Sequence, residues 1–218
     1  MGDARGVHAN GEDELMIDQM RLSVCAMVSV LVCVGCAQRS KHRDIIIPMP
    51  AGADRLAEAI DLTARGERAQ EAGDLEAAME YYQQATRLSA DAPAAAWNNL
   101  GMIHMQRGEY VGAVAHLRTA SELAPLDPQP MYNLGLTFHQ AGWDRQALES
   151  FIAALEREPN YLEAIRGAVT AAMRLRLTDE DALERLEHAL LVETDPRWRA
   201  IFQRERLSME TRLEALGR

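Results

Sequence analysis

The sequence has few aromatic residues, a single lysine and no cysteine after its first 36 residues. Only 5% of the 218 residues are aromatic, while alanine and leucine are plentiful, and this balance favours packed helices over a β-sandwich. Of the 23 basic residues all but Lys41 are arginines, and they are scattered along a chain whose formal net charge is −10. A nucleic-acid-binding domain normally carries a basic stripe, so we expect no nucleic-acid partner.

All three cysteines lie in a basic and then apolar stretch that runs from Met20 to Cys36. This layout is typical of a secretory signal, and the apolar run is too short for a membrane-spanning helix. Residues 33–36 read CVGC, which resembles the lipobox of bacterial lipoproteins, although Cys33 stands where leucine is usual. The resemblance implies that residues 20–35 are a lipoprotein signal peptide and that Cys36 carries the lipid. An ordinary secretory signal with incidental cysteines is the alternative.

The segments on either side of this signal have different compositions. Residues 1–19 are polar and acidic, the reverse of a signal's basic start, so we interpret them as an extension from a start codon placed too far upstream. Residues 36–54 contain two prolines without sustained periodicity and are predicted to form a flexible tether. Lipoproteins kept in the inner membrane often have aspartate after the lipidated cysteine, whereas this chain has Ala37 and Gln38. The resemblance therefore favours an outer-membrane lipoprotein that faces the periplasm.

A 34-residue period organises the chain after the tether. The period combines a W-x-x-L-G pattern at Trp97–Gly101 with later small residues and a proline, and it resembles the tetratricopeptide repeat family. The resemblance implies an all-α fold, a right-handed α-solenoid of helix hairpins. The matched positions are Asn99 and Asn133, Leu100 and Leu134, Gly101 and Gly135, Gly108 and Gly142, Ala113 and Ala147, Leu117 and Phe151, Ala120 and Ala154, and Pro125 and Pro159.

The period also sets the predicted domain limits. Residues 55–195 are expected to form the solenoid, and residues 196–218 place apolar residues at helical spacing among many charges. A stack of helix pairs leaves its last hydrophobic face open, so we expect this final segment to be a capping helix. The repeats are predicted at residues 59–93, 94–127 and 128–161, with a degenerate fourth at 162–195.

Two kinds of glycine recur with the period. Gly101 and Gly135 fall inside predicted helices, where glycine costs about 1 kcal/mol relative to alanine. We interpret them as space for a side chain of the second helix, namely Leu117 and Phe151. Gly108 and its counterpart one period later are predicted to end the first helix of each repeat.

The sequence offers no clear catalytic centre. After Cys36 it has no thiol, no Gly-rich phosphate loop and no Gly-x-Ser-x-Gly motif. No two histidines are spaced three or four residues apart, as a metal site on one helix would prefer, and His104 is interpreted as a structural residue. We therefore predict a protein that is not an enzyme, with no cofactor and no metal site.

The resemblance instead implies a binding surface, because in this family the first helix of each repeat lines a concave groove for peptides or partner helices. Amide side chains can bond a peptide backbone of any sequence, and methionine, leucine and tyrosine add adaptable apolar contact. Asparagines at these positions also tie adjacent helices together, and this structural reading stays open. The groove residues carried over are Asn98, Asn99, Met102, Met105, Gln106, Tyr132, Asn133, Leu136, His139 and Gln140.

Some relatives hold a C-terminal carboxylate with asparagine and a basic residue, but here only Arg166 and Arg174 could supply the charge. We predict a membrane-anchored scaffold or assembly factor that binds protein partners at the bacterial cell envelope, in pilus, secretion or cell-wall machinery. Two alternatives stay open. The chain could be a structural subunit that homo-oligomerises through its solenoid, or a soluble regulator without a lipid anchor.

Overall fold

The computed structural model describes residues 52–217, and within them the chain forms only helices and the turns between them. The predicted upstream extension, the signal peptide, the lipidation site Cys36 and most of the tether lie outside the described residues. The helices are α2 (Ala53–Glu71), α3 (Leu75–Leu88), α4 (Ala94–Gln106), α5 (Tyr110–Leu123), α6 (Gln129–Gln140), α7 (Asp144–Arg157), α8 (Leu162–Leu175), α9 (Glu180–Val192) and α10 (Pro196–Leu216).

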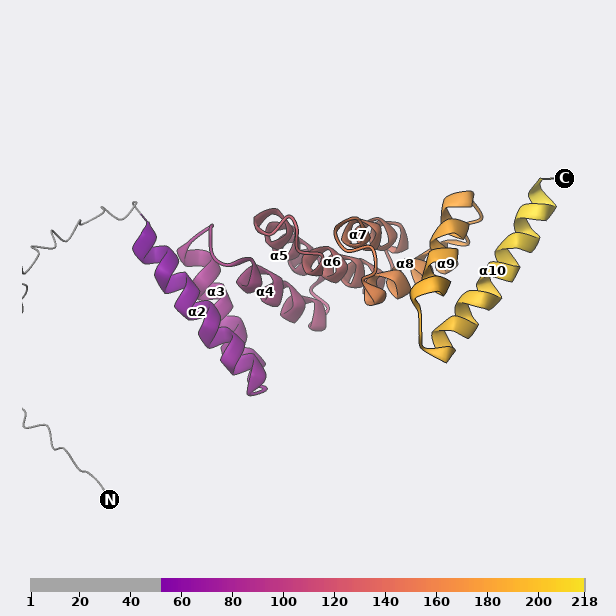
Figure 1. Cartoon of the computed structure of the whole chain (residues 1–218). Coiled ribbons are helices and arrows are strands. Elements are labelled where there is room, and N and C mark those ends of the chain that lie inside the picture. Colours follow the sequence, from indigo (N-terminus) through magenta and orange to yellow (C-terminus); the bar gives the residue numbers. More distant parts are fainter. Residues whose placement is uncertain (1–51, 218) are drawn as a thin grey trace, which may run out of the picture. The chain divides into compact units, whose positions relative to one another are not determined.

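Consecutive helices from α2 to α9 pack in pairs, the pairs stack in chain order, and α10 follows the last pair (Figure 1). The second helix of each pair also packs against the first helix of the next pair, so one hydrophobic core runs into the next. This is the all-α solenoid of helix hairpins that the period predicts. The first helix begins at Ala53, slightly before the expected start of the solenoid at residue 55.

The helix-interior glycines make room for one large side chain of the partner helix, as predicted. A Cβ atom on Gly101 would lie 2.7 Å from Cγ of Leu117, and one on Gly135 would lie 2.5 Å from Cδ1 of Phe151. Both side chains are fully buried, so neither can move away into solvent. The close approach of the two helices in each pair therefore requires the absence of a side chain at the glycine.

A helix-interior glycine also faces a large side chain in the first repeat, and the large side chain of the third repeat faces two glycines. A Cβ atom on Gly66 would lie 2.5 Å from Cε1 of Tyr82, which is fully buried. Phe151 is also approached closely by α8, because a Cβ atom on Gly167 would lie 2.6 Å from Cε1 and Cζ of the ring. The Phe151 ring is thus held between two helices that both lack a side chain at the point of contact.

A residue with positive φ ends the first helix of each pair. Gly73, Gly108 and Gly142 have φ values of 82°, 77° and 78°, which confirms the predicted role of the latter two. One period after Gly142 the fourth pair has Arg176, with a φ of 53° at the C-cap of α8. The left-handed conformation costs a residue with a Cβ atom about 1–2 kcal/mol, so the degenerate repeat is strained at this turn.

We expect the substitution Arg176→Gly to raise the free energy of unfolding by roughly 0.5–1 kcal/mol. The gain is smaller than the relieved strain, because glycine also increases the conformational entropy of the unfolded chain. Urea denaturation followed by circular dichroism measures this change. Gly142→Ala, which introduces a Cβ atom at the equivalent turn, is the matched control and should lower stability. An unchanged or lower stability of Arg176→Gly would contradict the strain.

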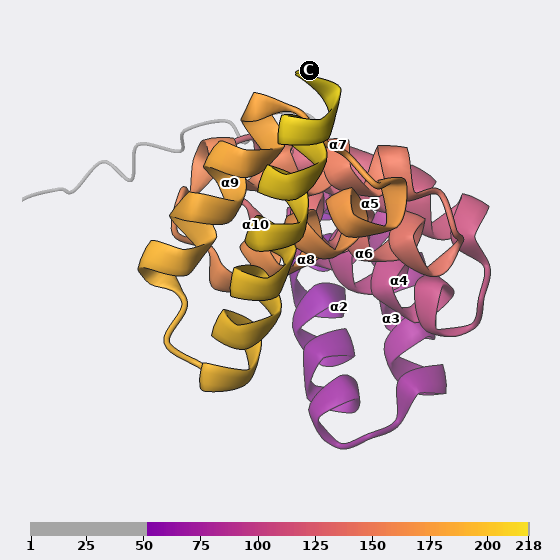
Figure 2. The ribbon, with the colours of Figure 1, turned by 90° about the vertical axis from the view of Figure 1, so that its right-hand side faces the viewer.

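The last helix covers the open end of the stack, as predicted. Figure 2 looks onto α10, which packs against α9 and α8. Phe202 and Met209 of this helix are buried, and its side chains Trp198, Ile201 and Leu213 pack beside them. The surface that they cover is formed by Ile165, Val169, Ala182, Leu186 and Ala189.

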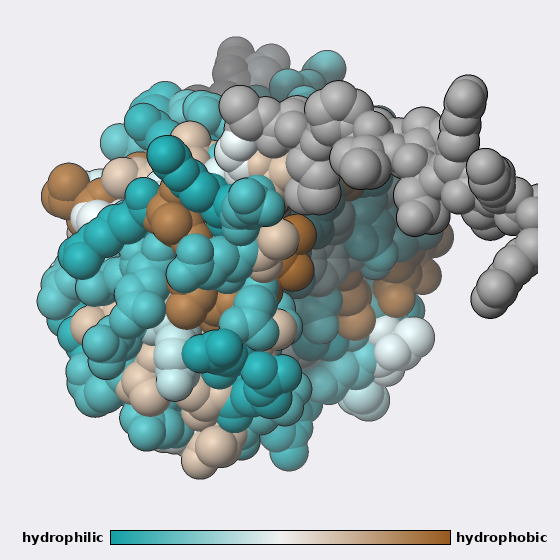
Figure 3. Space-filling view, turned by 90° about the vertical axis from the view of Figure 1, so that its left-hand side faces the viewer, coloured by the Kyte–Doolittle hydropathy of each residue, from teal (hydrophilic) through white to brown (hydrophobic). Residues whose placement is uncertain are grey.

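The opposite end of the stack is polar. Figure 3 looks onto the side where α2 lies, and the visible surface there is mostly hydrophilic, with hydrophobic residues in small separate areas. Ile60 and Leu75 are among the few large apolar residues exposed near this end. A polar outer face is what a terminal helix pair needs in order to remain soluble without a further repeat.

Candidate functional site

The predicted groove residues lie on α4 and α6, the first helices of the second and third repeats. Gln106 and Gln140, at the ends of these helices, are exposed to solvent. The partly exposed members of the set are Asn98, Asn99, Met102, Tyr132, Leu136 and His139. These eight side chains are accessible to a partner on the first-helix surface of the solenoid, which we call the groove face.

Two predicted groove residues are buried, and the prediction is wrong for them. Met105 is 5% exposed and Asn133 is 2% exposed. Met105 follows Gly101 by four residues, so it shares the side of α4 that packs against the neighbouring helix. Asn133 is enclosed where α6 packs against the preceding repeat. Neither side chain reaches an open surface.

The asparagines of α4 and α6 bond to one another across the repeat boundary. Asn133 donates through Nδ2 to Oδ1 of Asn98 at 2.8 Å, and Asn98 donates through Nδ2 to Oδ1 of Asn99 at 3.2 Å. Asn99 in turn donates through Nδ2 to the hydroxyl oxygen of Tyr82 on α3 at 3.1 Å. Tying adjacent repeats together is therefore one role that these amides do fill.

This row of bonds extends in both directions, and we call it the amide ladder. The hydroxyl of Tyr161, the N-cap of α8, donates to Oε1 of Gln129 at 2.9 Å, and Gln129 donates through Nε2 to Oδ1 of Asn133 at 3.2 Å. At the other end the hydroxyl of Tyr82 donates to Oε1 of Gln70 at 3.2 Å. The ladder runs head to tail from α8 to α2, so its bonds reinforce one another.

The ladder leaves bonding capacity for a ligand. An amide carries two N–H groups and an oxygen with two lone pairs, and each ladder step uses only one of each. Asn98 and Asn99 are partly exposed, so a partner can approach their side chains. The same residues can therefore hold the repeats in register and bond a polypeptide backbone.

An aromatic cluster follows the ladder at the boundary between the third and fourth repeats. The Tyr132 ring lies 5.1 Å from the Tyr161 ring and 5.9 Å from the Phe151 ring, centroid to centroid. Burial, with a smaller contribution from Tyr132 and Glu163, raises the pKa of Tyr161 to about 12. Both tyrosines remain partly exposed, so this cluster adds a rigid apolar step to the groove face.

The two arginines considered for a carboxylate clamp are engaged within the fold. Arg166 donates from Nε and Nη2 to the carboxylate of Glu193 at 2.7 and 2.9 Å, and the backbone N–H of Asp195 donates to the same carboxylate at 2.8 Å. These bonds hold the pKa of the Glu193 carboxyl below its usual range, and its side chain is completely buried. Arg174 pairs with Asp144 at 3.1 Å. The groove face thus lacks this type of clamp.

Three rings pack against one another in the second repeat, an arrangement that the spacing of the histidines did not indicate. The His104 ring lies 5.0 Å from the His116 ring, which lies 5.7 Å from Trp97, and His104 also pairs with Glu109. The rings come from both helices of the second repeat, so no short sequence interval connects the two histidines. Burial, and then the charge of His104, lowers the pKa of His116 below its usual value of 6.5.

The lowered pKa of His116 predicts a loss of stability in acid. The unfolded chain takes up the proton more readily than the folded chain, so the contribution present above pH 6.5 is lost as the pH falls below that value. We expect His116→Gln to reduce the fall in melting temperature between pH ~7.5 and ~5.5, where histidine titrates. Thermal melts of both chains measure it, and equal falls would contradict the role of His116.

No group of three or more histidine, cysteine or acidic side chains among residues 52–217 is arranged to hold a metal ion. Within the same residues, no helix combines the length and the apolar character needed to span a membrane.

Comparison with known families identifies the repeats. A TPR repeat model matches residues 101–142, and a tetratricopeptide repeat model matches residues 65–91 and 128–161. Two curated relatives are each described as BBSome complex member BBS4. The Bos taurus protein is 38% identical over 63 residues, which are 29% of this chain and 12% of the relative. The Mus musculus protein is 30% identical over 93 residues, which are 43% of this chain and 17% of the relative. The chain thus spans less than a fifth of these relatives.

Solved structures with similar folds include MamA, with 22% identity, a TM-score of 0.55 and coverage of 60% of this chain and 75% of that one. The first TPR domain of Spaghetti (RPAP3), bound to the HSP90 peptide SRMEEVD, is 16% identical with a TM-score of 0.53. This match covers 56% of this chain and 96% of that one. A Thermobaculum terrenum O-GlcNAc transferase mutant is 28% identical with a TM-score of 0.53, and the match covers 65% of this chain and 26% of that one. This chain therefore carries tetratricopeptide repeats in an all-α solenoid, a fold that in general serves protein–protein interaction.

Proposed function

We propose that this protein is a non-enzymatic scaffold whose groove face binds a segment of a partner protein at the bacterial cell envelope. A lipid on Cys36 holds it at the membrane, and the envelope machinery that it serves is of the pilus, secretion or cell-wall class. Anchoring raises the effective concentration of the solenoid beside other membrane components, so a modest groove affinity is sufficient for recruitment.

The observation that carries the proposal is the composition of the groove face. Partly exposed amides at Asn98 and Asn99 lie on α4, while Tyr132 and Leu136 present partly exposed apolar groups on α6. This combination suits an extended segment, because the amides bond its backbone and the apolar groups contact its side chains. The fold of the RPAP3 domain, which holds a peptide, supports this use of the surface.

The lipid anchor is supported by the sequence from Met20 to Cys36, with its basic start, apolar run and CVGC ending. Substitution Cys36→Ser should shift the protein from the membrane fraction to the soluble fraction of the envelope. Globomycin, which blocks lipoprotein signal cleavage, should cause the uncleaved precursor to accumulate. A wild-type chain that is soluble and insensitive to globomycin would favour a soluble regulator instead.

The double substitution Asn98→Ala and Tyr132→Ala tests the groove. Pull-down from detergent-solubilised envelope should recover a discrete partner with the wild-type chain and lose it with this variant. A matched control replaces Gln146 and Glu149, two exposed residues of α7, by alanine and should retain the partner. Retention of the partner by the groove variant would contradict the proposal. A self-associated chain whose size, measured by light scattering, is unchanged in the same variant would favour the homo-oligomer.

A further inference from the structure

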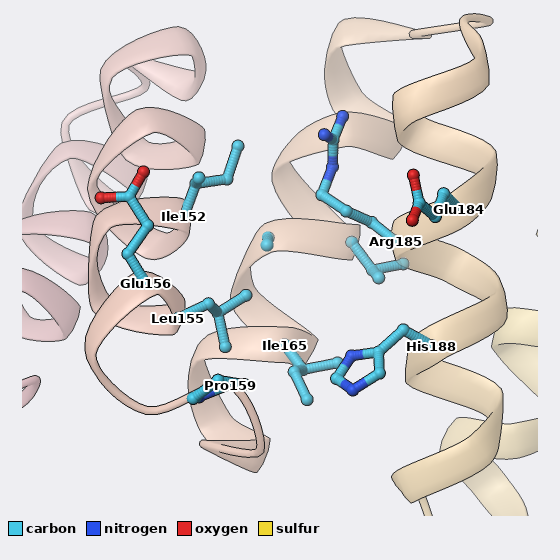
Figure 4. Close-up of a pocket in the computed structure, with 10 residues that line it drawn as sticks. Ile152, Leu155, Glu156, Pro159, Ile165, Glu184, Arg185 and His188 are labelled. Carbon is cyan, nitrogen blue, oxygen red and sulfur yellow. The ribbon is translucent and has the colours of Figure 1, made fainter.

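The degenerate fourth repeat contains an apolar pocket that lies away from the groove face. The pocket has a volume of about 350 Å³ and lies between α7, α8 and α9. Figure 4 shows Ile152 and Leu155 of α7 and Ile165 of α8 around the space, with Glu184, Arg185 and His188 of α9 opposite. The volume falls within the range of binding pockets, roughly 300–1,000 Å³.

The sequence explains why the pocket opens in this repeat. One period after Gly135 the chain has Val169, which lines the pocket. In the first three repeats a glycine at this position lets the second helix approach closely, whereas a branched side chain keeps α9 away. Accordingly α8 and α9 pack against each other less closely than the helices of the first three pairs. Val169 in place of glycine therefore leaves a pocket between the helices, where the other repeats have a large buried side chain of the second helix.

The pocket and the groove face lie on different sides of α8. Ile165, Ala168 and Val169 share one side of the helix and line the pocket. Arg166 and Thr170, which correspond to the groove positions of the preceding repeats, lie on another side. A ligand in the pocket would therefore leave the groove face free.

The charges at the pocket rim select the kind of ligand. Glu156 on α7 and Glu184 on α9 are exposed on opposite sides of the pocket, and neither forms an ion pair with another described residue. Among the described residues that line the pocket, Arg185 is the only arginine or lysine; it lies 3.8 Å from Asp179, and His188 completes the edge. The rim thus presents two carboxylates that a basic partner can approach.

An exposed apolar residue extends the pocket along α9. Leu191 is 83% exposed, and helical spacing places it on the same side of α9 as Glu184 and His188. A ligand that lies along α9 can therefore contact the apolar floor and Leu191 together. This length favours a helical segment over a compact small molecule, because a helix presents apolar residues at i, i+4 and i+7.

We propose that this pocket binds a basic amphipathic helix of a partner protein, whose apolar side chains enter the hollow while its lysines or arginines meet Glu156 and Glu184. The site is separate from the groove face and provides a second contact for a multivalent scaffold. Its occupant differs from the extended segment proposed for the groove, so one partner can use both surfaces or two partners can bind at once.

Two synthetic helical peptides with the same leucine pattern test the proposal, one with lysine and one with glutamate at the polar positions. Fluorescence anisotropy with the full chain in detergent should show the lysine peptide binding at least ~10-fold more tightly, about 1.4 kcal/mol. The double substitution Glu156→Lys and Glu184→Lys should reverse this preference. The control Glu122→Lys and Glu149→Lys makes the same charge change at two exposed residues of α5 and α7 away from the pocket and should preserve it.

A second variant and the groove variant separate the possible outcomes. Ala168→Leu fills the pocket floor and should abolish binding of the lysine peptide, while the Asn98→Ala and Tyr132→Ala chain should bind it normally. Binding lost only in the groove variant would overturn the pocket site and leave the proposed function standing. The proposal is also overturned if the pocket charge variant and its control change the affinity for the lysine peptide equally. A dimer of the chain that forms without peptide and that Ala168→Leu disrupts would overturn it as well.

Discussion

Replacing Gly135 by alanine is expected to lower the free energy of unfolding by at least about 2 kcal/mol, although alanine is the better helix former. The new Cβ atom would lie 2.5 Å from two carbons of the Phe151 ring. That ring is fully buried and also meets Gly167 of α8, so it has no open space to move into. The helices of the third repeat must separate instead, and this disturbs the contact with the fourth.

Gly112→Ala is the matched control for this prediction. Gly112 is also inside a helix, but a Cβ atom there would lie 3.5 Å from the nearest side-chain atom, Nδ1 of His104, which is ordinary contact. This substitution should raise stability by up to about 1 kcal/mol through helix propensity alone. In a Phe151→Ala background, Gly135→Ala should cost nothing further. Urea denaturation of the wild type, the two single variants Gly135→Ala and Phe151→Ala, and the double variant measures the coupling between the two residues. Additive changes in the free energy of unfolding would contradict the proposed contact between the Phe151 ring and a Cβ atom at position 135.

Replacing Glu193 by glutamine is expected to lower the free energy of unfolding by about 3 kcal/mol. The Glu193 side chain is completely buried and accepts bonds from Arg166 and from the backbone N–H of Asp195. Removing its charge leaves the Arg166 guanidinium without its partner beside Trp198, 5.4 Å from the ring centroid. Because Glu193 joins α9 to α10, hydrogen exchange should become faster along the capping helix first.

The pH dependence of this effect has a defined sign. The pKa of the Glu193 carboxyl is lowered in the folded chain from 4.5, so its contribution is complete above that pH and is lost as the pH falls through the folded pKa. The stability difference between wild type and Glu193→Gln should therefore shrink below pH 4.5. As a control, Asp61→Asn removes an exposed pair with Arg65 at 2.7 Å and should change stability by less than about 1 kcal/mol.

The architecture could be predicted from the sequence because its causes repeat. Gly101 and Gly135 recur at one offset together with the side chains that they accommodate, so a single period reports helix pairing, turn positions and stacking. The capping helix could be predicted for a related reason, since an open end of a stack must be covered. The predicted solenoid therefore agrees with the structure even in the degenerate repeat, where Arg176 and Val169 replace glycines.

The candidate site was only partly accessible to sequence reasoning, because its contacts cross the repeats. Asn133 has the same residue type and register as Asn99, yet it is buried, since exposure depends on how closely adjacent pairs pack. One step of the amide ladder had a sequence signal, because Gln129 precedes Asn133 by four residues on the same helix. The bond between Arg166 and Glu193 and the stack of His104 on His116 join different helices and had none.

Site-specific photo-crosslinking in living cells tests the central claim most directly, namely that the groove face binds a partner protein. A photoreactive amino acid at Gln106 or Gln140, the exposed residues of that face, should give one discrete adduct, and Asn98→Ala with Tyr132→Ala should abolish it. The same probe at Glu149 on α7 should give no such adduct. Adducts from Glu149 alone, or adducts from Gln106 and Gln140 that persist in the double variant, would contradict the account.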